Sequence, residues 1–191
     1  MKVSIRPVTV GDAAALAALY SSQRAFLAPY EPVRPGAFFT VRGQRREAEV
    51  AVEEWRAGRL HRFVIEADGA IVGSITASGV VRGPFGSARI GYFVGREWNG
   101  RGVGSAAVSQ ALDWAFGSAG LHRIEAATLV DNKGSQRVLR RNGFRVEGLA
   151  RNYLQIAGRW RDHVLFARTV EDPPIDLGPC DAEVRLLDEM L

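Results

Sequence analysis

The pattern of apolar and polar positions along this chain of 191 residues predicts seven short β-strands. Two pairs of neighbouring strands are separated by turn residues. Asp68-Gly69 has the composition of a tight hairpin turn, and Ala157-Gly158 marks a second turn near the end of the predicted sheet. The predicted strands cover residues 3–8, 61–67, 70–81, 88–95, 123–130, 144–154 and 161–170.

Apolar residues recur at helical spacing in four further segments, which we expect to be helices. Between the first two of them lies segment 26–40, which contains Pro29, Pro32 and Pro35. We expect this segment to be irregular, because proline lacks a backbone donor and disrupts helices and sheets. The resulting order of elements is βααβββαβαββ. The predicted helices cover about residues 12–24, 41–57, 102–119 and a segment that runs through Ser135.

The turn before the third helix is the strongest sign of a ligand site, and it reads Trp98-Asn99-Gly100-Arg101-Gly102-Val103-Gly104. Glycine at every second position lets the backbone approach a ligand closely, because no Cβ stands in the way. The following helix presents free N–H groups and the positive end of its dipole to the turn. The segment is therefore suited to a pyrophosphate. A tight strand-to-helix turn without a ligand is the alternative.

Two other phosphate-binding loops do not fit these residues. A Walker loop ends in Gly-Lys-Ser/Thr, whereas Gly104 is followed by Ser105 and Ala106. A dinucleotide fingerprint has the spacing Gly-x-Gly-x-x-Gly and follows the first strand of its βαβ unit. Here the spacing is Gly-x-Gly-x-Gly, and about half of the chain precedes it.

A second motif lies about 30 residues downstream and runs from Asn132 through Ser135 to Phe144. Gly143 suits the position after a helix where φ becomes positive, and we expect Phe144 to enter a strand and pack in the core. The two motifs together resemble those of the GCN5-related N-acetyltransferases (GNAT). Residues 99–104 are similar to the family's acyl-CoA loop, Gln/Arg-x-x-Gly-x-Gly/Ala, with Asn99 at the first position.

The resemblance covers about residues 3–170 and implies an α/β (α+β) fold. In this fold a mixed, mostly antiparallel central sheet has flanking helices and a V-shaped splay between the fourth and fifth strands. Acetyl-CoA would lie in the splay, and the acceptor amine would enter from the opposite side. We therefore assign residues 1–170 to an acetyltransferase domain and residues 171–191 to an acidic C-terminal tail.

Several stretches resemble the RimJ/RimL branch of the family, whose members acetylate the N-terminal α-amine of a ribosomal protein. The branch also contains acetyltransferases of small amines and antibiotics, so either kind of acceptor is compatible with the resemblance. Tyr92 and Phe93 point to opposite faces of one strand, and at least one of them is expected to pack in the core. The stretches are residues 28–32, 38–40, 90–93, 147–154 and 157–163.

The resemblance implies which residues contact acetyl-CoA. The backbone at Phe93–Gly95 would hold the pantetheine arm, and the N–H near Val94 would stabilise the oxyanion. The implied contacts are Phe93, Val94, Gly95, Asn99, Gly100, Arg101, Gly102, Val103, Gly104, Ser105, Asn132 and Ser135.

Two residues are candidates for catalysis. In the RimL-like branch a serine that matches Ser135 protonates the departing thiolate; a helix-capping hydroxyl is the alternative. Many relatives use a tyrosine at the position of Leu139. Glu125 is the candidate base, acting through a water, and a carboxylate paired with a neighbouring arginine is the alternative. Three base positions of the family are empty, because Arg89, Ala127 and Asn152 occupy them.

The empty base positions favour an α-amine as acceptor. An α-amine has a pKa of about 7.7–8.0, so roughly a fifth of it is neutral near pH 7.2, whereas a lysine side chain is less than about 0.1% neutral. An α-amine therefore loses less in a site without a strong base. Glu31, Phe38 and Phe39 are the candidates for the acceptor groove, with an exposed loop charge as the alternative for Glu31.

Charge is unevenly distributed along the chain. The tail from Glu171 to Leu191 has a net charge of −6. Because the whole chain has a net charge of +4, residues 1–170 have a net charge of +10. A basic domain favours a polyanionic cofactor such as CoA, or nucleic acid, and scattered surface arginine is the alternative. The aromatic-flanked patterns of RNA-binding modules are missing, so we expect no direct nucleic-acid recognition.

Composition adds expectations about class and location. The chain is 47% hydrophobic and 24% charged, has no signal-peptide pattern at its start and has no apolar run of the length that spans a membrane. Cys180 is the only cysteine, which fits a reducing cytoplasm, and no metal-ligand pattern is present. We expect a cytoplasmic enzyme without a metal. A homodimer is compatible with the sequence. A catalytically silent acyl-CoA-binding module is the alternative class.

Overall fold

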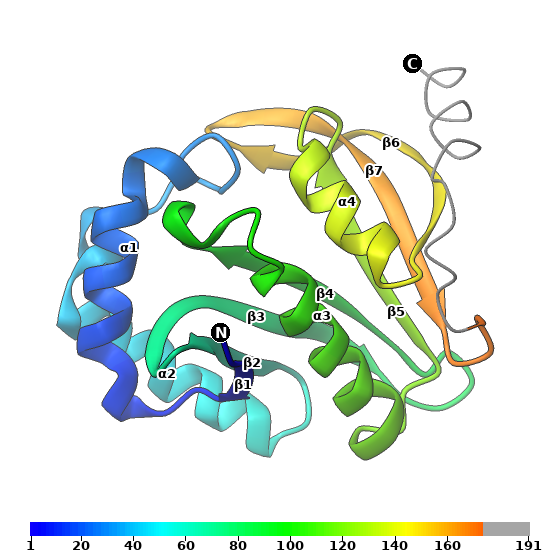
Figure 1. The fold of residues 1–191 in the computed structure, drawn as a ribbon, viewed down its shortest axis with the longest axis horizontal. Coiled ribbons are helices and arrows are strands. Elements are labelled where there is room, and N and C mark those ends of the chain that lie inside the picture. Colours follow the sequence, from blue (N-terminus) through cyan, green and yellow to red (C-terminus); the bar gives the residue numbers. More distant parts are fainter. Residues whose placement is uncertain (174–191) are drawn as a thin grey trace.

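The computed structural model describes residues 1–173 as a seven-stranded sheet flanked by helices (Figure 1). Residues 174–191, which include Cys180 and most of the predicted acidic tail, lie outside the described residues. The strands lie side by side in the order β1-β2-β3-β4-β5-β7-β6. Their bounds are β1 Val3–Pro7, β2 His61–Ala67, β3 Ala70–Val81, β4 Ser87–Val94, β5 Arg123–Leu129, β6 Arg145–Ile156 and β7 Arg159–Thr169.

Strands β4 and β5 form the parallel pair of this sheet, and the other neighbours are antiparallel. Their pairing starts at Ser87–Arg123 and ends at Arg89–Glu125. Beyond that point each strand continues, β4 to Val94 and β5 to Leu129, without pairing to the other. The predicted mixed sheet and its splay between the fourth and fifth strands are therefore confirmed.

Helices cover both faces of the sheet, and the strand residues alternate between two cores. On β2, Phe63 and Ile65 belong to a core with α3 (Val103–Asp113) and α4 (Lys133–Arg141), whereas Val64 belongs to a core with α1 (Ala13–Leu27) and α2 (Val41–Arg56). The two pairs of helices thus lie on opposite faces, which Figure 1 shows with α1 and α2 at the left and α3 and α4 in front of the sheet.

Several element bounds differ from the sequence-based expectation. Helix α1 continues to Leu27, so the expected irregular segment starts later, and it contains the short 3-10 helix Gly36–Phe39. Helix α3 ends at Asp113 and passes into a π-helical turn, Trp114–Ser118. Strand β6 reaches Ile156, because an irregularity at Asn152, with φ +47°, lets the strand resume its pairing with β7.

The end of α4 follows the predicted glycine stop. Gly143 has φ +73°, and its N–H donates to Arg140 O (2.9 Å), while Phe144 N–H donates to Leu139 O (3.1 Å). These two bonds satisfy the last carbonyls of the helix in a Schellman motif. Phe144 is almost fully buried at 2% exposure, as expected.

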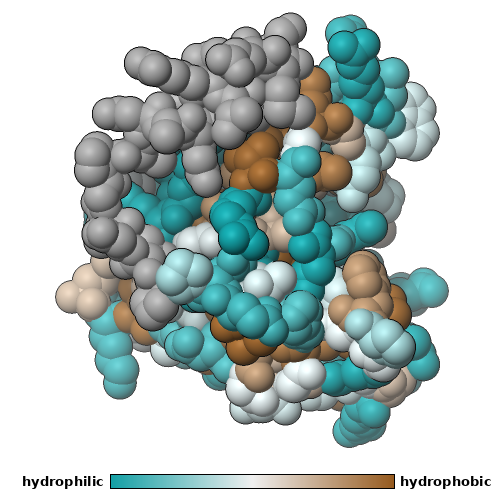
Figure 2. All heavy atoms as spheres, turned by 90° about the vertical axis from the view of Figure 1, so that its right-hand side faces the viewer, coloured by the Kyte–Doolittle hydropathy of each residue, from teal (hydrophilic) through white to brown (hydrophobic). Residues whose placement is uncertain are grey.

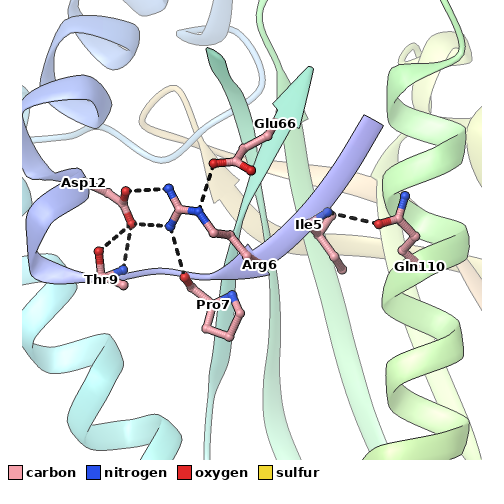
Figure 3. A network of polar contacts seen from close by, with 7 residues as sticks. All are labelled: Ile5, Arg6, Pro7, Thr9, Asp12, Glu66 and Gln110. Carbon is pink, nitrogen blue, oxygen red and sulfur yellow. Dashed lines mark hydrogen bonds and ion pairs between the residues drawn. The ribbon is translucent and has the colours of Figure 1, made fainter. Parts of the chain in front are cut away.

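Polar side chains fix the edge strand β1 to its neighbours (Figure 3). Arg6 donates to both carboxylate oxygens of Asp12, at 2.7 and 2.8 Å, and to Glu66 Oε1 on β2 at 2.8 Å. On the other side of β1, Gln110 of α3 accepts from Ile5 N–H and donates to Val3 O, each at 3.0 Å. Gln110 thus satisfies backbone groups of an edge strand that has no further strand beside it in the described sheet.

The surface is mostly polar on the face shown in Figure 2, where hydrophilic side chains surround scattered hydrophobic ones. Within residues 1–173, no helix combines the length and the apolar character needed to cross a membrane.

Candidate active site

The glycine-rich turn has the geometry of an anion-binding loop. Gly100 and Gly102 have φ values of +75° and +81°, which other residues rarely adopt. The first intrahelical bond of α3 is donated by Ala106 N–H to Gly102 O (3.0 Å), so the N–H groups of Val103, Gly104 and Ser105 precede it. No atom lies within 4 Å of a Cβ built on Gly100 or Gly102, which leaves the space in front of the turn open.

A cavity of about 440 Å³ lies between this turn, the end of β4 and α4. Most of the predicted acetyl-CoA contacts line it. Gly95 and Arg101 do not, since Gly95 N–H bonds Val72 O (2.8 Å) and Arg101 lies over the Trp98 ring at 5.5 Å. The predicted residues on its wall are Phe93, Val94, Asn99, Gly100, Gly102, Val103, Gly104, Ser105, Asn132 and Ser135.

Three basic side chains that the sequence analysis missed also line this cavity. Lys133, Arg137 and Arg141 lie at positions i, i+4 and i+8 of α4, so they follow one face of the helix. Their spacing was visible in the sequence, but only the packing of α4 against the turn shows which face they occupy. Cationic side chains and helical N–H groups fit the phosphates of a nucleotide cofactor.

A hydroxyl at the start of α4 meets a hydroxyl from β4 at the splay. Asn132 Oδ1 caps the helix by accepting Ser135 N–H (3.1 Å). Ser135 Oγ lies 2.9 Å from the hydroxyl of Tyr92 on β4, which also donates to Ser135 O (3.2 Å). Burial raises the pKa of Tyr92 well above its ordinary value, so the phenol stays protonated and can donate.

A second cavity of about 570 Å³ opens on the side of the sheet that α1 and α2 cover. The predicted acceptor residues Glu31 and Phe38 line it, together with Gly91 and His163. Phe39 does not line it, because its ring packs under Arg24 at 4.4 Å. The two cavities share the residues Leu27, Tyr30, Tyr92, Phe93, Asn132 and Ser135.

Glu31 and Glu125, the two predicted carboxylates, have different surroundings. Burial raises the pKa of Glu31, which lines the second cavity, and Arg34 at 3.9 Å opposes that effect. Glu125 lies where the β4–β5 pairing ends and lines neither cavity. Burial alone would raise its pKa, but hydrogen bonds from Arg123 (3.0 Å) and Arg89 (3.2 Å) bring it below its usual range. The structure therefore places Glu125 in the ion pair that was its alternative interpretation.

The backbone N–H of Val94 faces the splay. Gly95 N–H donates to Val72 on β3, and N–H groups alternate in direction along a strand. The Val94 N–H therefore points away from β3, toward the side where β4 has separated from β5. Within residues 1–173 no group of three or more His, Cys, Asp or Glu side chains is arranged to hold a metal ion.

Comparison with known proteins identifies the family. A family model described as an acetyltransferase (GNAT) domain matches residues 2–145. The [Ribosomal protein uS5]-alanine N-acetyltransferase of Escherichia coli (strain K12) is 36% identical over 173 residues, 90% of this chain and 89% of that protein. The probable N-acetyltransferase YjcK of Bacillus subtilis (strain 168) is 35% identical over 167 residues, 86% of this chain and 92% of that protein.

Solved structures agree with these relatives. Mycobacterium smegmatis RimJ in complex with CoA-disulfide superposes with a TM-score of 0.87 at 38% identity, over 98% of this chain and 88% of that one. The ribosomal-protein-S5-alanine acetyltransferase of Vibrio fischeri superposes with a TM-score of 0.85 at 34% identity, over 91% of this chain and 97% of that one. The chain therefore belongs to the GNAT family and is an acetyl-CoA-dependent N-acetyltransferase of the RimJ/RimL type.

Proposed function

We propose that this enzyme transfers the acetyl group of acetyl-CoA directly to the N-terminal α-amine of a ribosomal protein, in a ternary complex. The observation that carries the proposal is that two cavities, one beside the glycine-rich turn and one on the α1/α2 side, meet at Tyr92, Asn132 and Ser135. A thioester in the first cavity and an amine in the second can meet there without a covalent enzyme intermediate. The names of the two ribosomal-protein-alanine acetyltransferases support the acceptor class.

The turn and α4 would hold acetyl-CoA. The N–H groups of Val103, Gly104 and Ser105 suit the pyrophosphate, since they precede the first bond of α3. Lys133, Arg137 and Arg141 supply positive charge on the opposite wall. The backbone of Phe93 and Val94 and the Asn132 side chain suit the pantetheine arm, because they line the part of the cavity next to the splay.

The reacting carbonyl would lie beside the end of β4. The Val94 N–H faces the splay and can donate to the oxyanion that forms when the amine attacks the thioester. When the C–S bond breaks, Ser135 can protonate the departing thiolate, and Tyr92 holds the Ser135 hydroxyl in place at 2.9 Å.

The second cavity, which lies on the α1/α2 side and is called the acceptor cavity below, suits a cationic chain terminus. Its wall carries the Glu31 carboxylate, which attracts an ammonium group, and Phe38 and Phe93, which cover apolar side chains. An α-amine also needs less deprotonation than a lysine side chain, since its pKa is about 7.7–8.0. Both features favour a protein N-terminus.

Thiol release from acetyl-CoA with N-terminal ribosomal peptides that start with alanine tests the proposal. Each peptide is run beside a copy whose N-terminus is blocked, and mass spectrometry locates the added acetyl group. We expect transfer to the free peptide and none to its blocked copy. Transfer only to small amines would assign the enzyme to the other acceptor class of its branch, and transfer to lysine side chains of blocked peptides would contradict the α-amine.

A further inference from the structure

The acceptor cavity is lined by a buried histidine, His163, to which the sequence analysis assigned no role. His163 lies on β7, is 3% exposed and lines the cavity that also contains Ser135. Its position follows from the sheet register. His163 pairs with Leu129 at the end of β5, and cross-strand partners present their side chains on the same face.

Alternation along β5 shows which face this is. Ile124 and Ala126 belong to the core under α3 and α4, so Leu129 and His163 face the acceptor side instead. The chain then turns directly into α4: Asn132 N–H donates to Leu129 O (3.0 Å), and Asn132 Oδ1 accepts Ser135 N–H at the start of the helix. The imidazole is thus one strand away from the turn that positions the proposed acid.

The hydrogen bond at Nδ1 of the His163 ring defines its tautomer. Nδ1 lies 3.0 Å from Arg161 O, and a carbonyl oxygen only accepts, so Nδ1 carries the hydrogen. In neutral imidazole, Nε2 then has the free lone pair. Tyr153 of β6 packs against the ring with centroids 5.5 Å apart, which restricts its rotation.

We propose that His163 is the general base of the acetyl transfer and that its Nε2 takes the proton from the acceptor nitrogen. This proposal rests on the proposed function only in requiring an amine acceptor in this cavity. It fills the role for which Glu125 was the sequence-based candidate.

The acetyl transfer forms one C–N bond and breaks one C–S bond. The lone pair of the neutral amine forms the C–N bond while the carbonyl π pair moves onto oxygen, and the nitrogen becomes a cationic, strongly acidic N–H. Nε2 accepts that proton, the oxyanion re-forms the C=O bond, and the C–S bond breaks with its electron pair leaving on sulfur. The thiolate takes a proton from Ser135, which solvent restores, and the imidazolium of His163 returns its proton to solvent. The products are the amide and CoA thiol.

Burial favours the neutral form of His163, which is the form that accepts a proton. Burial lowers its pKa below the ordinary value, and the guanidinium of Arg161 acts in the same direction. The bond to Arg161 O and the carboxylates of Asp162 and Asp131 oppose the shift. A base weaker than a free amine is sufficient, because the nitrogen of the tetrahedral adduct is far more acidic than a free ammonium.

The test compares His163→Gln and His163→Ala with wild type, using whichever amine the wild type acetylates. We expect roughly a 10²-fold or greater loss of kcat in both variants, with an unchanged dissociation constant for acetyl-CoA. The acid limb of the wild-type kcat profile, with a pKa below about 6.5, should be absent from His163→Gln. Free imidazoles should restore part of the kcat of His163→Ala, with rates that rise with the pKa of the added base.

Two control variants separate the base from other charged groups. His122→Gln changes an exposed histidine that lines neither cavity, and it should keep the wild-type kcat and pH profile. Glu31→Gln should raise KM for the acceptor and keep the acid limb. The proposal is overturned if His163→Gln retains more than half of the wild-type kcat, if its acid limb persists and no imidazole rescues His163→Ala, or if the limb disappears in Glu31→Gln instead. A wild type that acetylates only small amines would contradict the proposed function but leave this test in place.

Discussion

The hydroxyl of Tyr92 lies 2.9 Å from Ser135 Oγ, although 43 positions separate the two residues in the chain. Tyr92 extends from β4 and Ser135 lies in the first turn of α4, so the contact bridges the two branches of the splay. Leu139, at the helix position for which the family resemblance implied a tyrosine, is fully buried here at 0% exposure. The structure thus brings a phenol from a strand to Ser135, the proposed acid.

This contact predicts that Tyr92 and Ser135 act as a unit. Ser135→Ala should lower kcat about 10- to 100-fold, because the thiolate loses its proton donor. Tyr92→Phe should lower kcat less, and the double variant should be no slower than Ser135→Ala alone, which steady-state kinetics measure as a coupling energy. Fully additive effects would show that the hydroxyls act independently.

The glycine-rich turn predicts a selective effect on the cofactor. Gly102→Ala places a Cβ at φ +81°, which strains the turn and moves the N–H groups of α3. We expect KM for acetyl-CoA to rise about tenfold or more, with a smaller change in KM for the acceptor.

Gly58→Ala is the matched control for this variant. Gly58 also has a positive φ, +69°, and open space around its Cβ, but it follows α2 and lines neither cavity. Both variants should lose a similar stability of about 1–2 kcal/mol, and only Gly102→Ala should lose affinity. Equal KM values for acetyl-CoA in the two variants would contradict the role of the turn.

A substitution of Gly91, in the wall of the acceptor cavity, tests whether the acceptor binds there. Gly91 lies on β4 with no atom within 4 Å of a built Cβ and without a positive φ. Gly91→Val therefore fills part of the cavity with a side chain and causes no backbone strain. We expect a higher KM for the acceptor and an unchanged dissociation constant for acetyl-CoA, as measured by calorimetry. Gly148→Val on β6 is the control, because Gly148 has the same open surroundings and lines neither cavity. An equal KM in the two variants would place the acceptor elsewhere.

The ion pair of Arg6 and Asp12 predicts a pH-dependent stability (Figure 3). Hydrogen bonds from Arg6 lower the pKa of Asp12 from 3.8 to about 2, against the effect of burial. A lowered carboxylate pKa contributes stability that is present above pH 4 or so and is lost as pH falls toward about 2. Asp12→Asn should therefore lower the free energy of unfolding by about 2 kcal/mol at pH 7 and remove part of its acid dependence.

Denaturant unfolding between pH 3 and pH 7 measures this difference. Glu54→Gln is the control, because the Glu54–Arg59 pair lies at the exposed end of α2 and should contribute little. A difference between wild type and Asp12→Asn that stays constant over the whole range would contradict the linkage.

For His61 we expect a substitution to raise the stability of the fold. Its side chain is buried at 7% exposure, and its ring centroid lies 4.6 Å from the ring centroids of Trp55 and Trp114. Within residues 1–173 neither of its ring nitrogens has a hydrogen-bond partner. Burial lowers its pKa, so protonation favours the unfolded state and stability should fall as pH decreases from 7 to 5. His61→Phe should raise stability by about 1 kcal/mol at pH 7 and weaken this pH dependence, which thermal unfolding measures. A less stable variant would indicate that the ring is needed for packing.

The sequence by itself determined those features that depend on local backbone preference. Alternation and turn residues predicted the strands, and the glycine at the end of α4 predicted the positive φ of Gly143. These signals are readable because each acts over a few neighbouring residues. Together with the motif resemblance they were sufficient to predict the family, the order of the strands and helices, and the glycine-rich turn.

The tertiary structure decided which side chains meet. Glu125 became an ion-pair partner of Arg89 because the short parallel pairing of β4 and β5 places them side by side. Tyr92 reached Ser135, and His163 reached the acceptor cavity, through sheet register and helix packing over long sequence distances. The direction of a side chain depends on that register, and a shift of one residue would turn it to the other face. For this reason the hydroxyl partner of the proposed acid, and the proposed base, emerged only from the fold.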